Sequence, residues 1–354
     1  MSDESKADVR QYVRNAYEQL GLPRLIIIIF LLSLFALAVI MRMDLAILVK
    51  DSITRIGMNG ILVLAMLPTL ACGVGLNFGL PVGVIAGLVG AVTSMNWGLK
   101  GFAGFAAAMA IAIPLAVIAG YLYAMLLERV QGQEMMVGTY VGFSLVSGMC
   151  MFWLLAPYRN PAMIFALGGK GLRTTITLDR TFGKVLNDFL GFSILDVYIP
   201  TGLLLFMGVF YVAIALFFKS KAGLAMRTVG SNPMYARSSG INVQGMRTLG
   251  VILSTVLAAI GILVYSQSYG FVQLYTAPLT AAFPAVASVL IGGASLRKAT
   301  IGHALLGTVL FHTLLTIALP VTQTVLQGAD ISEIARMIMS NGMIIYALTR
   351  AERR

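Results

Sequence analysis

The sequence has little of what most catalytic and metal sites are built from. Its 354 residues include only two cysteines and two histidines, and 11% are charged. Cys72 and Cys150 fall within apolar runs, so we expect buried thiols and no disulfide. No spacing typical of zinc, haem or iron–sulfur sites occurs. His303 and His312 lie in one apolar run, where a helix–helix hydrogen bond is favoured over a metal or proton relay. No cofactor is therefore expected.

Acidic side chains are missing from the interior of the long apolar runs. All fourteen Asp and Glu residues are predicted to lie in loops or at helix ends. Proton-driven carriers and ion pumps usually need buried ionisable groups, so this absence argues against both classes and favours a neutral, polar solute. The phosphate-loop pattern G-x-x-x-x-G-K-[ST] is also missing, since Lys170 is followed by Gly171. The chain is expected to be non-catalytic, with any ATP hydrolysis on a separate subunit.

Apolar residues are what the sequence does have. They make up 58% of the chain, and the mean hydropathy is +0.89. This predicts an all-α polytopic membrane protein, because a helix satisfies its own backbone in lipid and about 20 apolar residues cross a bilayer. Ten candidate spans are present, at residues 25–41, 56–74, 79–95, 102–127, 135–156, 198–218, 248–266, 279–294, 300–320 and 334–349. Segments 79–95 and 279–294 are short enough for partial crossings, so eight or nine complete spans are the alternative.

The transmembrane domain is predicted to run from residue 25 to residue 349. Residues 1–24 have the apolar spacing of an amphipathic helix on the cytoplasmic surface, with an unstructured tail as the alternative. The apolar run after them is too long for a cleaved signal peptide. Ten spans place both termini, including the tail 350–354, in the cytoplasm, and Lys and Arg are then more numerous inside. We therefore attribute the net charge of +11 to membrane orientation rather than to nucleic-acid binding.

Two apolar segments, 68–91 and 275–295, are interrupted by proline and glycine at comparable positions in the two halves. Paired, broken segments of this kind point to a transport site. The alternative is that glycines spaced four apart, such as Gly79, Gly83 and Gly87, only allow close helix packing. Polar and aromatic side chains near these segments, Asn59 and Tyr265 among them, are candidates to line a pathway, although hydroxyls can also bond their own helix. The predicted substrate pathway is Asn77, Phe78, Ser266, Gln267, Thr280 and Phe283.

A polar island, residues 219–247, separates two of the later spans. It holds five basic residues and no acidic one, which places it on the cytoplasmic side. Asn232 followed by Pro233 is typical of a capped helix start, and Gly240 suits the residue after a helix end. We expect a short helix over about 233–239 that contacts a partner. The residues predicted to couple to that partner are Asn232, Pro233, Met234, Tyr235, Ala236, Arg237 and Gly240.

Three stretches resemble the permease subunits of bacterial ABC importers for simple sugars, a family related to nucleoside and branched-chain amino-acid permeases. The first, AMRTVGSNPMYARSSGINV at 225–243, matches the family pattern at Gly230, Asn232, Ala236, Arg237, Ser239, Gly240 and Ile241. The second, VASVLIGGASL at 286–296, supplies Gly292, Gly293 and Ser295, with Gly302 and Gly307 beyond it. The third, GVGLNFGLPVG at 73–83, has Asn77 and Gly79 where the family usually has Asp and Ser. The loop 157–197 matches no substrate class.

The resemblance implies a fold similar to that of cobalamin-type (type II) importer permeases, with about ten helices and an internal repeat. It implies a bacterial cytoplasmic (inner) membrane location, two ATPase subunits at the helix near 233–239, and a periplasmic or lipid-anchored solute-binding protein. A second permease copy or a paralogue would complete the pathway. The expected solute is a simple sugar, with a nucleoside or a branched-chain amino acid as alternatives. An autonomous channel or secondary carrier is the alternative from a different class.

Overall fold

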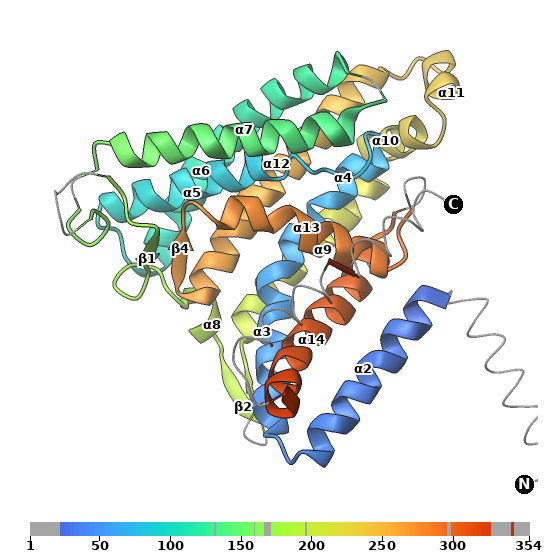
Figure 1. Ribbon diagram of the computed structural model, residues 1–354. Coiled ribbons are helices and arrows are strands. Elements are labelled where there is room, and N and C mark those ends of the chain that lie inside the picture. Colours follow the sequence, from blue (N-terminus) through green and yellow to red (C-terminus); the bar gives the residue numbers. More distant parts are fainter. Residues whose placement is uncertain are drawn as a thin grey trace, which may run out of the picture.

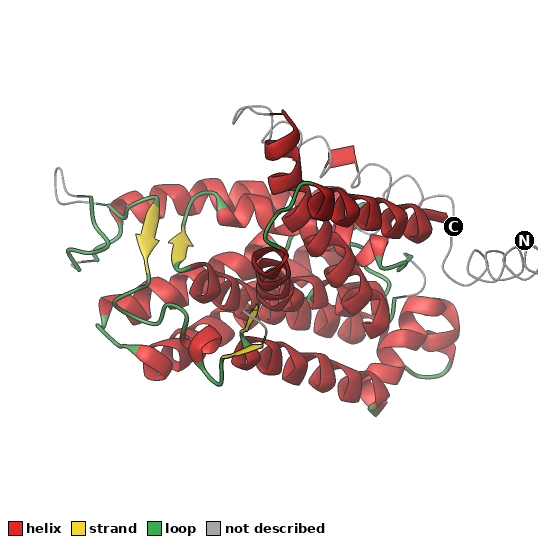
Figure 2. Ribbon diagram, turned by 90° about the horizontal axis from the view of Figure 1, so that it is seen from below, coloured by secondary structure: helices red, strands yellow, loops and turns green. Residues whose placement is uncertain are grey.

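The described part of the chain is helical, with four short strands that the sequence did not predict. The computed structural model describes residues 22–130, 132–158, 160–165, 171–194, 197–295, 299–326 and 341–342. The helices are α2 (Leu22–Ile40), α3 (Leu45–Leu64), α4 (Met66–Ala71), α5 (Pro81–Asn96), α6 (Gly101–Glu128), α7 (Glu134–Leu155), α8 (Val185–Asp188), α9 (Thr201–Lys219), α10 (Lys221–Ser231), α11 (Pro233–Ser238), α12 (Val243–Tyr269), α13 (Ala277–Ile291) and α14 (Ile301–Leu326). The strands β1 (Thr175–Thr177) and β4 (Phe271–Gln273) pair antiparallel, as do β2 (Phe192–Ile194) and β3 (Val197–Ile199) (Figure 2).

Nine of the ten predicted spans coincide with apolar helices. Within the described part of the chain, six helices are long and apolar enough to cross a membrane: 45–71, 101–128, 134–155, 201–219, 243–269 and 301–324. Three shorter apolar helices, at 27–40, 81–96 and 277–291, match the remaining predicted spans near these positions. The tenth span, 334–349, and the amphipathic segment 1–24 lie almost wholly outside the described residues, so the total of ten stays a prediction.

The second span differs from its prediction at its start. Helix α3 begins at Leu45, eleven residues before the predicted span 56–74. The carboxylate of Asp44 caps it by accepting hydrogen bonds from the amides of Ala46, at 2.9 Å, and Ile47, at 3.3 Å. Asp51 and Arg55 therefore lie on the helix, and the prediction that every acidic residue sits in a loop or at a helix end is wrong for Asp51.

Helix α12 is the centre of the molecule, since it contacts α3, α5 and α6 along its length. Glycine makes the α5 contact possible. A side chain at Gly83 would meet the carbonyl oxygen of Thr255, and one at Gly87 would meet that of Ala259. Close packing, the alternative role given to these glycines, is therefore confirmed at both positions.

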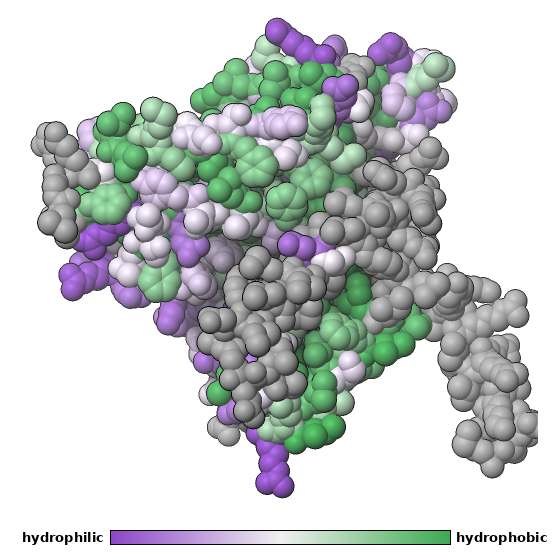
Figure 3. Space-filling view, in the orientation of Figure 1, coloured by the Kyte–Doolittle hydropathy of each residue, from purple (hydrophilic) through white to green (hydrophobic). Residues whose placement is uncertain are grey.

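Several helices present apolar side chains outward. Tyr121 and Leu122 on α6, Leu155 on α7 and Val209 on α9 are each at least half exposed. Figure 3 shows apolar residues on the face that carries α7, and hydrophilic residues gathered toward the ends. A soluble domain of this size would bury such side chains, whereas a membrane protein turns them to lipid or to a second subunit.

The polar island and the long loop lie at opposite ends of the helix bundle. Helix α9 runs from the end that carries β3 to α10, and α12 runs back from α11 to β4, which pairs with β1 of the loop 157–197 (Figure 1). If α9 and α12 cross a membrane, segment 219–247 faces one side and loop 157–197 the other.

Candidate functional site

The predicted partner-binding helix exists. Helix α11 covers Pro233–Ser238, one residue shorter than predicted, and the side-chain oxygen of Asn232 accepts the amide of Tyr235 at 3.0 Å. Gly240 has φ +78°, a left-handed conformation that glycine adopts without strain. Both predicted capping roles are therefore confirmed.

Helix α11 offers its side chains to the outside of the molecule. Met234 is 80% exposed and Tyr235 is 62% exposed, and Arg237 is exposed as well. Ala236 is fully buried instead, and its amide donates to the carbonyl of Asn232 at 3.0 Å. Among the predicted coupling residues, Ala236 thus seats the helix against the protein, while Met234, Tyr235 and Arg237 form an exposed surface.

The six predicted pathway residues do not come together. Asn77 is buried in a network, where its amide donates to the Ser254 hydroxyl at 2.8 Å and its oxygen accepts from the Tyr123 hydroxyl at 3.2 Å. Ser266 is buried. Gln267 is also buried; its side-chain oxygen accepts the amide of Leu186 at 3.1 Å. Its side chain therefore holds α8 in place.

Phe78 and Phe283 contact each other across the two interrupted segments, with ring centroids 5.8 Å apart. They line a small apolar crevice between α5, α7 and α13. Thr280 is the one residue of the six that lines a separate, partly polar pocket, and its hydroxyl donates to the carbonyl of Thr276 at 3.2 Å.

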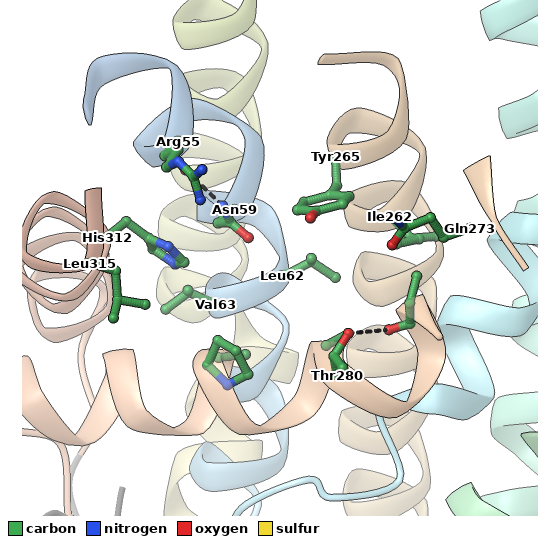
Figure 4. A pocket seen from close by; sticks show the side chains of 14 residues that line it. Arg55, Asn59, Leu62, Val63, Ile262, Tyr265, Gln273, Thr280, His312 and Leu315 are labelled. Carbon is green, nitrogen blue, oxygen red and sulfur yellow. Dashed lines mark hydrogen bonds between the residues drawn. The ribbon is translucent and has the colours of Figure 1, made fainter. Parts of the chain in front are cut away.

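That pocket is a cavity of about 180 Å³ between four helices and a strand. Figure 4 shows α3 and α14 on one side, α12 and β4 on the other, and α13 running across them, so that α13 forms the floor. The pocket lies beside the second half of α12 and the first half of α13, which is the half of the molecule toward β4 and away from α11. Its lining residues are Arg55, Asn59, Leu62, Val63, Ile262, Tyr265, Gln273, Ala277, Thr280, Ala281, Pro284, Ala285, His312 and Leu315.

Sequence reasoning missed Arg55 and Gln273. Arg55 falls one residue before the predicted span, and only the cap at Asp44 could have indicated that the helix starts earlier. Gln273 lies in a strand whose pairing with β1 joins residues almost 100 positions apart, which no local pattern reveals. Asn59 and Tyr265, which the sequence did indicate as polar candidates, both line the pocket.

A second polar cluster lies near α11. Arg247, in the first turns of α12, forms an ion pair with Glu134 of α7 at 3.5 Å and donates to the carbonyl of Gly73 at 3.1 Å. The side chains of the ion pair are only 19% and 11% exposed. The hydroxyl of Thr248 donates to the carboxylate of Glu128 at 2.8 Å. These contacts join the helix that follows α11 to the interrupted segment and to the α6–α7 connection.

Comparison with protein families identifies the class of the chain. Residues 24–348 match the family described as branched-chain amino acid transport system / permease component. The chain belongs to this family. The resemblance to the family of ABC importer permeases is therefore confirmed, and the chain is a multi-pass membrane protein of this family.

Curated relatives of the permease match shorter stretches. The autoinducer 2 import system permease protein LsrC of Yersinia enterocolitica is 29% identical over 51% of this chain and 49% of its own length. The guanosine ABC transporter permease protein NupQ of Bacillus subtilis is 31% identical over 27% of this chain and 30% of its own. The nucleoside ABC transporter permease protein NupC of Lactococcus lactis is 47% identical over 14% of this chain and 16% of its own. The permease thus aligns with about half or less of these relatives, and no solved structure matches it.

Proposed function

We propose that this permease is the membrane subunit of an ATP-driven ABC importer in a bacterial inner membrane, and that it forms the pathway for a small polar solute. The membership of the family and its autoinducer and nucleoside relatives support the class. A simple sugar is the first candidate solute and a nucleoside is the second. A cavity of about 180 Å³ is below the roughly 300–1,000 Å³ of pockets for drug-sized ligands, which favours a small solute.

The observation that carries the proposal is helix α11. Met234 and Tyr235 are large side chains that this short, capped helix holds in the open at one end of the molecule. Exposed apolar and aromatic residues of this kind commonly anchor a protein partner. This chain lacks a phosphate loop, so in an ATP-driven importer a separate ATPase subunit must bind the nucleotide and contact the permease. We assign α11 as the surface that this ATPase contacts.

The pocket and α11 lie toward opposite ends of α12, an arrangement that suits alternating access. In this proposal a solute-binding protein delivers the solute at the β4 end, and α13 blocks its way onward. Movement of α11 by the ATPase pair would shift α12 and, through Arg247, the segment after Gly73. Such a shift would open the cavity toward the cytoplasm. A second permease copy or a paralogue would supply the other half of the pathway.

The test is a charge reversal on the exposed surface of α11. In the complex that copurifies with the permease, Arg237→Glu should abolish the stimulation of ATPase activity that the permease provides, because the partner surface then meets a carboxylate. Ala236→Pro should do the same, since it removes the hydrogen bond to the Asn232 carbonyl and distorts α11.

The matched control is Arg180→Glu, which reverses an exposed arginine in the loop at the opposite end. It should leave ATPase stimulation unchanged. All three variants should insert into the membrane in normal amounts. Full stimulation in both α11 variants would contradict the proposed coupling role.

A further inference from the structure

Arg55 is a cation on a helix long and apolar enough to span a membrane, and it lines the pocket. Within the described residues, its guanidinium takes part in no hydrogen bond or ion pair; the amide of Asn59 bonds only to the Arg55 backbone carbonyl, at 2.9 Å. Charged residues inside spanning helices are costly, and where they occur they face a water-filled path or a partner group. Arg55 is also exposed, and a guanidinium without a partner beside a cavity has donors available for a ligand.

His312 reaches the same pocket from α14, on the same side as Arg55 (Figure 4). Only 6% of this residue is exposed, and its Nε2 atom has no hydrogen-bond partner in the described structure. The helix–helix hydrogen bond predicted for this histidine is therefore not made through Nε2. Figure 4 shows the imidazole turned into the pocket beside Arg55. A buried polar atom without a partner calls for an explanation, and a ligand is one.

We propose that Arg55 and His312 form the solute-binding end of this pocket and that they hold two adjacent oxygen atoms of the solute. The proposal deepens the function proposed above, since it concerns the solute of that permease. Two chemistries present such oxygens: the neighbouring hydroxyls of a neutral sugar or ribose ring, and a carboxylate.

The arrangement of the donors supports oxygen acceptors. A guanidinium is a rigid fork that matches two oxygens side by side, and it keeps its charge at any physiological pH. No carboxylate of the described residues lines the pocket, so a cationic group has no partner there. The other polar groups, Asn59, Gln273 and Thr280, can bond the rest of a hydroxylated solute.

The first test measures the charge preference of the pocket and needs no knowledge of the solute. The full chain is placed in lipid nanodiscs and carries Cys150→Ser, so that the only native thiol left is Cys72, which is fully buried. Thr280→Cys then adds a thiol on the pocket floor. An anionic methanethiosulfonate reagent should label this thiol severalfold faster than a cationic one. Arg55→Gln should remove the preference, and Arg55→Lys should keep it. Ser193→Cys on β2, outside the pocket, is the control and should show the same rates with and without Arg55. An Arg55-independent preference at Thr280→Cys would overturn the assignment of Arg55.

The second test measures protection of the same thiol by two probes, D-ribose for neighbouring hydroxyls and D-ribonate for a carboxylate. At least one probe should slow labelling severalfold, and Arg55→Gln should abolish that protection. Arg55→Lys should keep protection by ribonate, because binding of a carboxylate needs the positive charge. It should lose protection by ribose, because binding of two neighbouring hydroxyls needs the paired N–H donors of the guanidinium. His312→Phe, which retains a ring but removes Nε2, should weaken protection while the charge preference stays.

Absence of protection by both probes, or protection that survives Arg55→Gln, would overturn the proposal. The labelling needs neither ATP nor a partner, so its outcome is independent of the α11 experiment. Full ATPase stimulation in both α11 variants, together with intact protection of the thiol, would refute the coupling role of α11 and leave the assignment of the pocket standing.

Discussion

At the scale of single residues, two described glycines with no room for a side chain lie where α13 meets α14. A side chain at Gly307 would overlap the carbonyl oxygen of Ser288, and one at Gly292 would overlap that of His303. These helices can approach only because neither position carries a Cβ atom, a common device in membrane helix packing. Since α13 is also the floor of the pocket, this contact fixes the position of the floor.

Gly307→Ala should therefore destabilise the permease. The added methyl group must push α13 and α14 apart, and such overpacking costs roughly 1–3 kcal/mol. Thermal unfolding of the full chain in detergent should show a clear decrease in midpoint temperature. Gly302→Ala lies on the same helix with its nearest neighbouring atom 3.9 Å away, so it should leave the midpoint nearly unchanged. Equal midpoints for both variants would refute the packing argument.

At the scale of elements, α12 connects α11 with the interrupted segment after α4. Arg247 bonds the carbonyl of Gly73, and two turns further along α12 Ser254 accepts the amide of Asn77. The part of the interrupted segment between α4 and α5 is thus bound to α12 at Gly73 and at Asn77. A displacement of α12 that starts at α11 would carry this segment with it.

Breaking the Arg247–Glu134 pair on one side should cost more than removing it altogether. Arg247→Met leaves the mostly buried carboxylate of Glu134 without its partner, and Glu134→Gln does the same to the guanidinium of Arg247. In comparable buried pairs the removal of one partner lowers the free energy of unfolding by about 3–5 kcal/mol. The double variant Arg247→Met with Glu134→Gln removes both charges, so it should lower the unfolding midpoint by less than the sum of the single changes. Chemical or thermal unfolding of the four proteins measures this coupling. Strict additivity would show that the two side chains contribute independently.

At the scale of the whole molecule, the helices build a bundle that carries the exposed, capped helix α11 at one end and β4 toward the other (Figure 1). The polar pocket lies in the half toward β4. Outward-facing apolar residues on α6, α7 and α9 leave room for lipid or for another subunit. This division suits a subunit that opens a path when a partner moves it, and it suits a self-sufficient carrier less well.

The permease alone should therefore not accumulate solute. Reconstituted in liposomes as the single polypeptide, it should give no ATP-dependent uptake of radiolabelled ribose or guanosine, because it has no phosphate loop with which to bind the nucleotide. Liposomes that contain the copurified complex, with solute-binding protein outside and ATP inside, should accumulate one of the two. Uptake driven by the lone chain would favour the channel or secondary-carrier alternative.

The sequence by itself determined the class of the protein and most of its elements. Long apolar runs can only be satisfied as helices in a membrane, so nine of the predicted spans appear as apolar helices, and the Asn232–Pro233 cap specifies α11 through contacts within four residues. Family membership was also visible in the motif around α11. These features depend on neighbouring residues, which a linear pattern records.

Only the tertiary structure decided where the pocket lies and what lines it. The pocket residues Arg55, Tyr265, Gln273, Thr280 and His312 come from four helices and a strand that meet in space. Two of the predicted pathway residues, Asn77 and Gln267, are hydrogen-bonded inside the protein instead. A buried amide and a ligand-facing amide look alike in a sequence. The packing of α12 against its neighbours determines which of them can reach a solute.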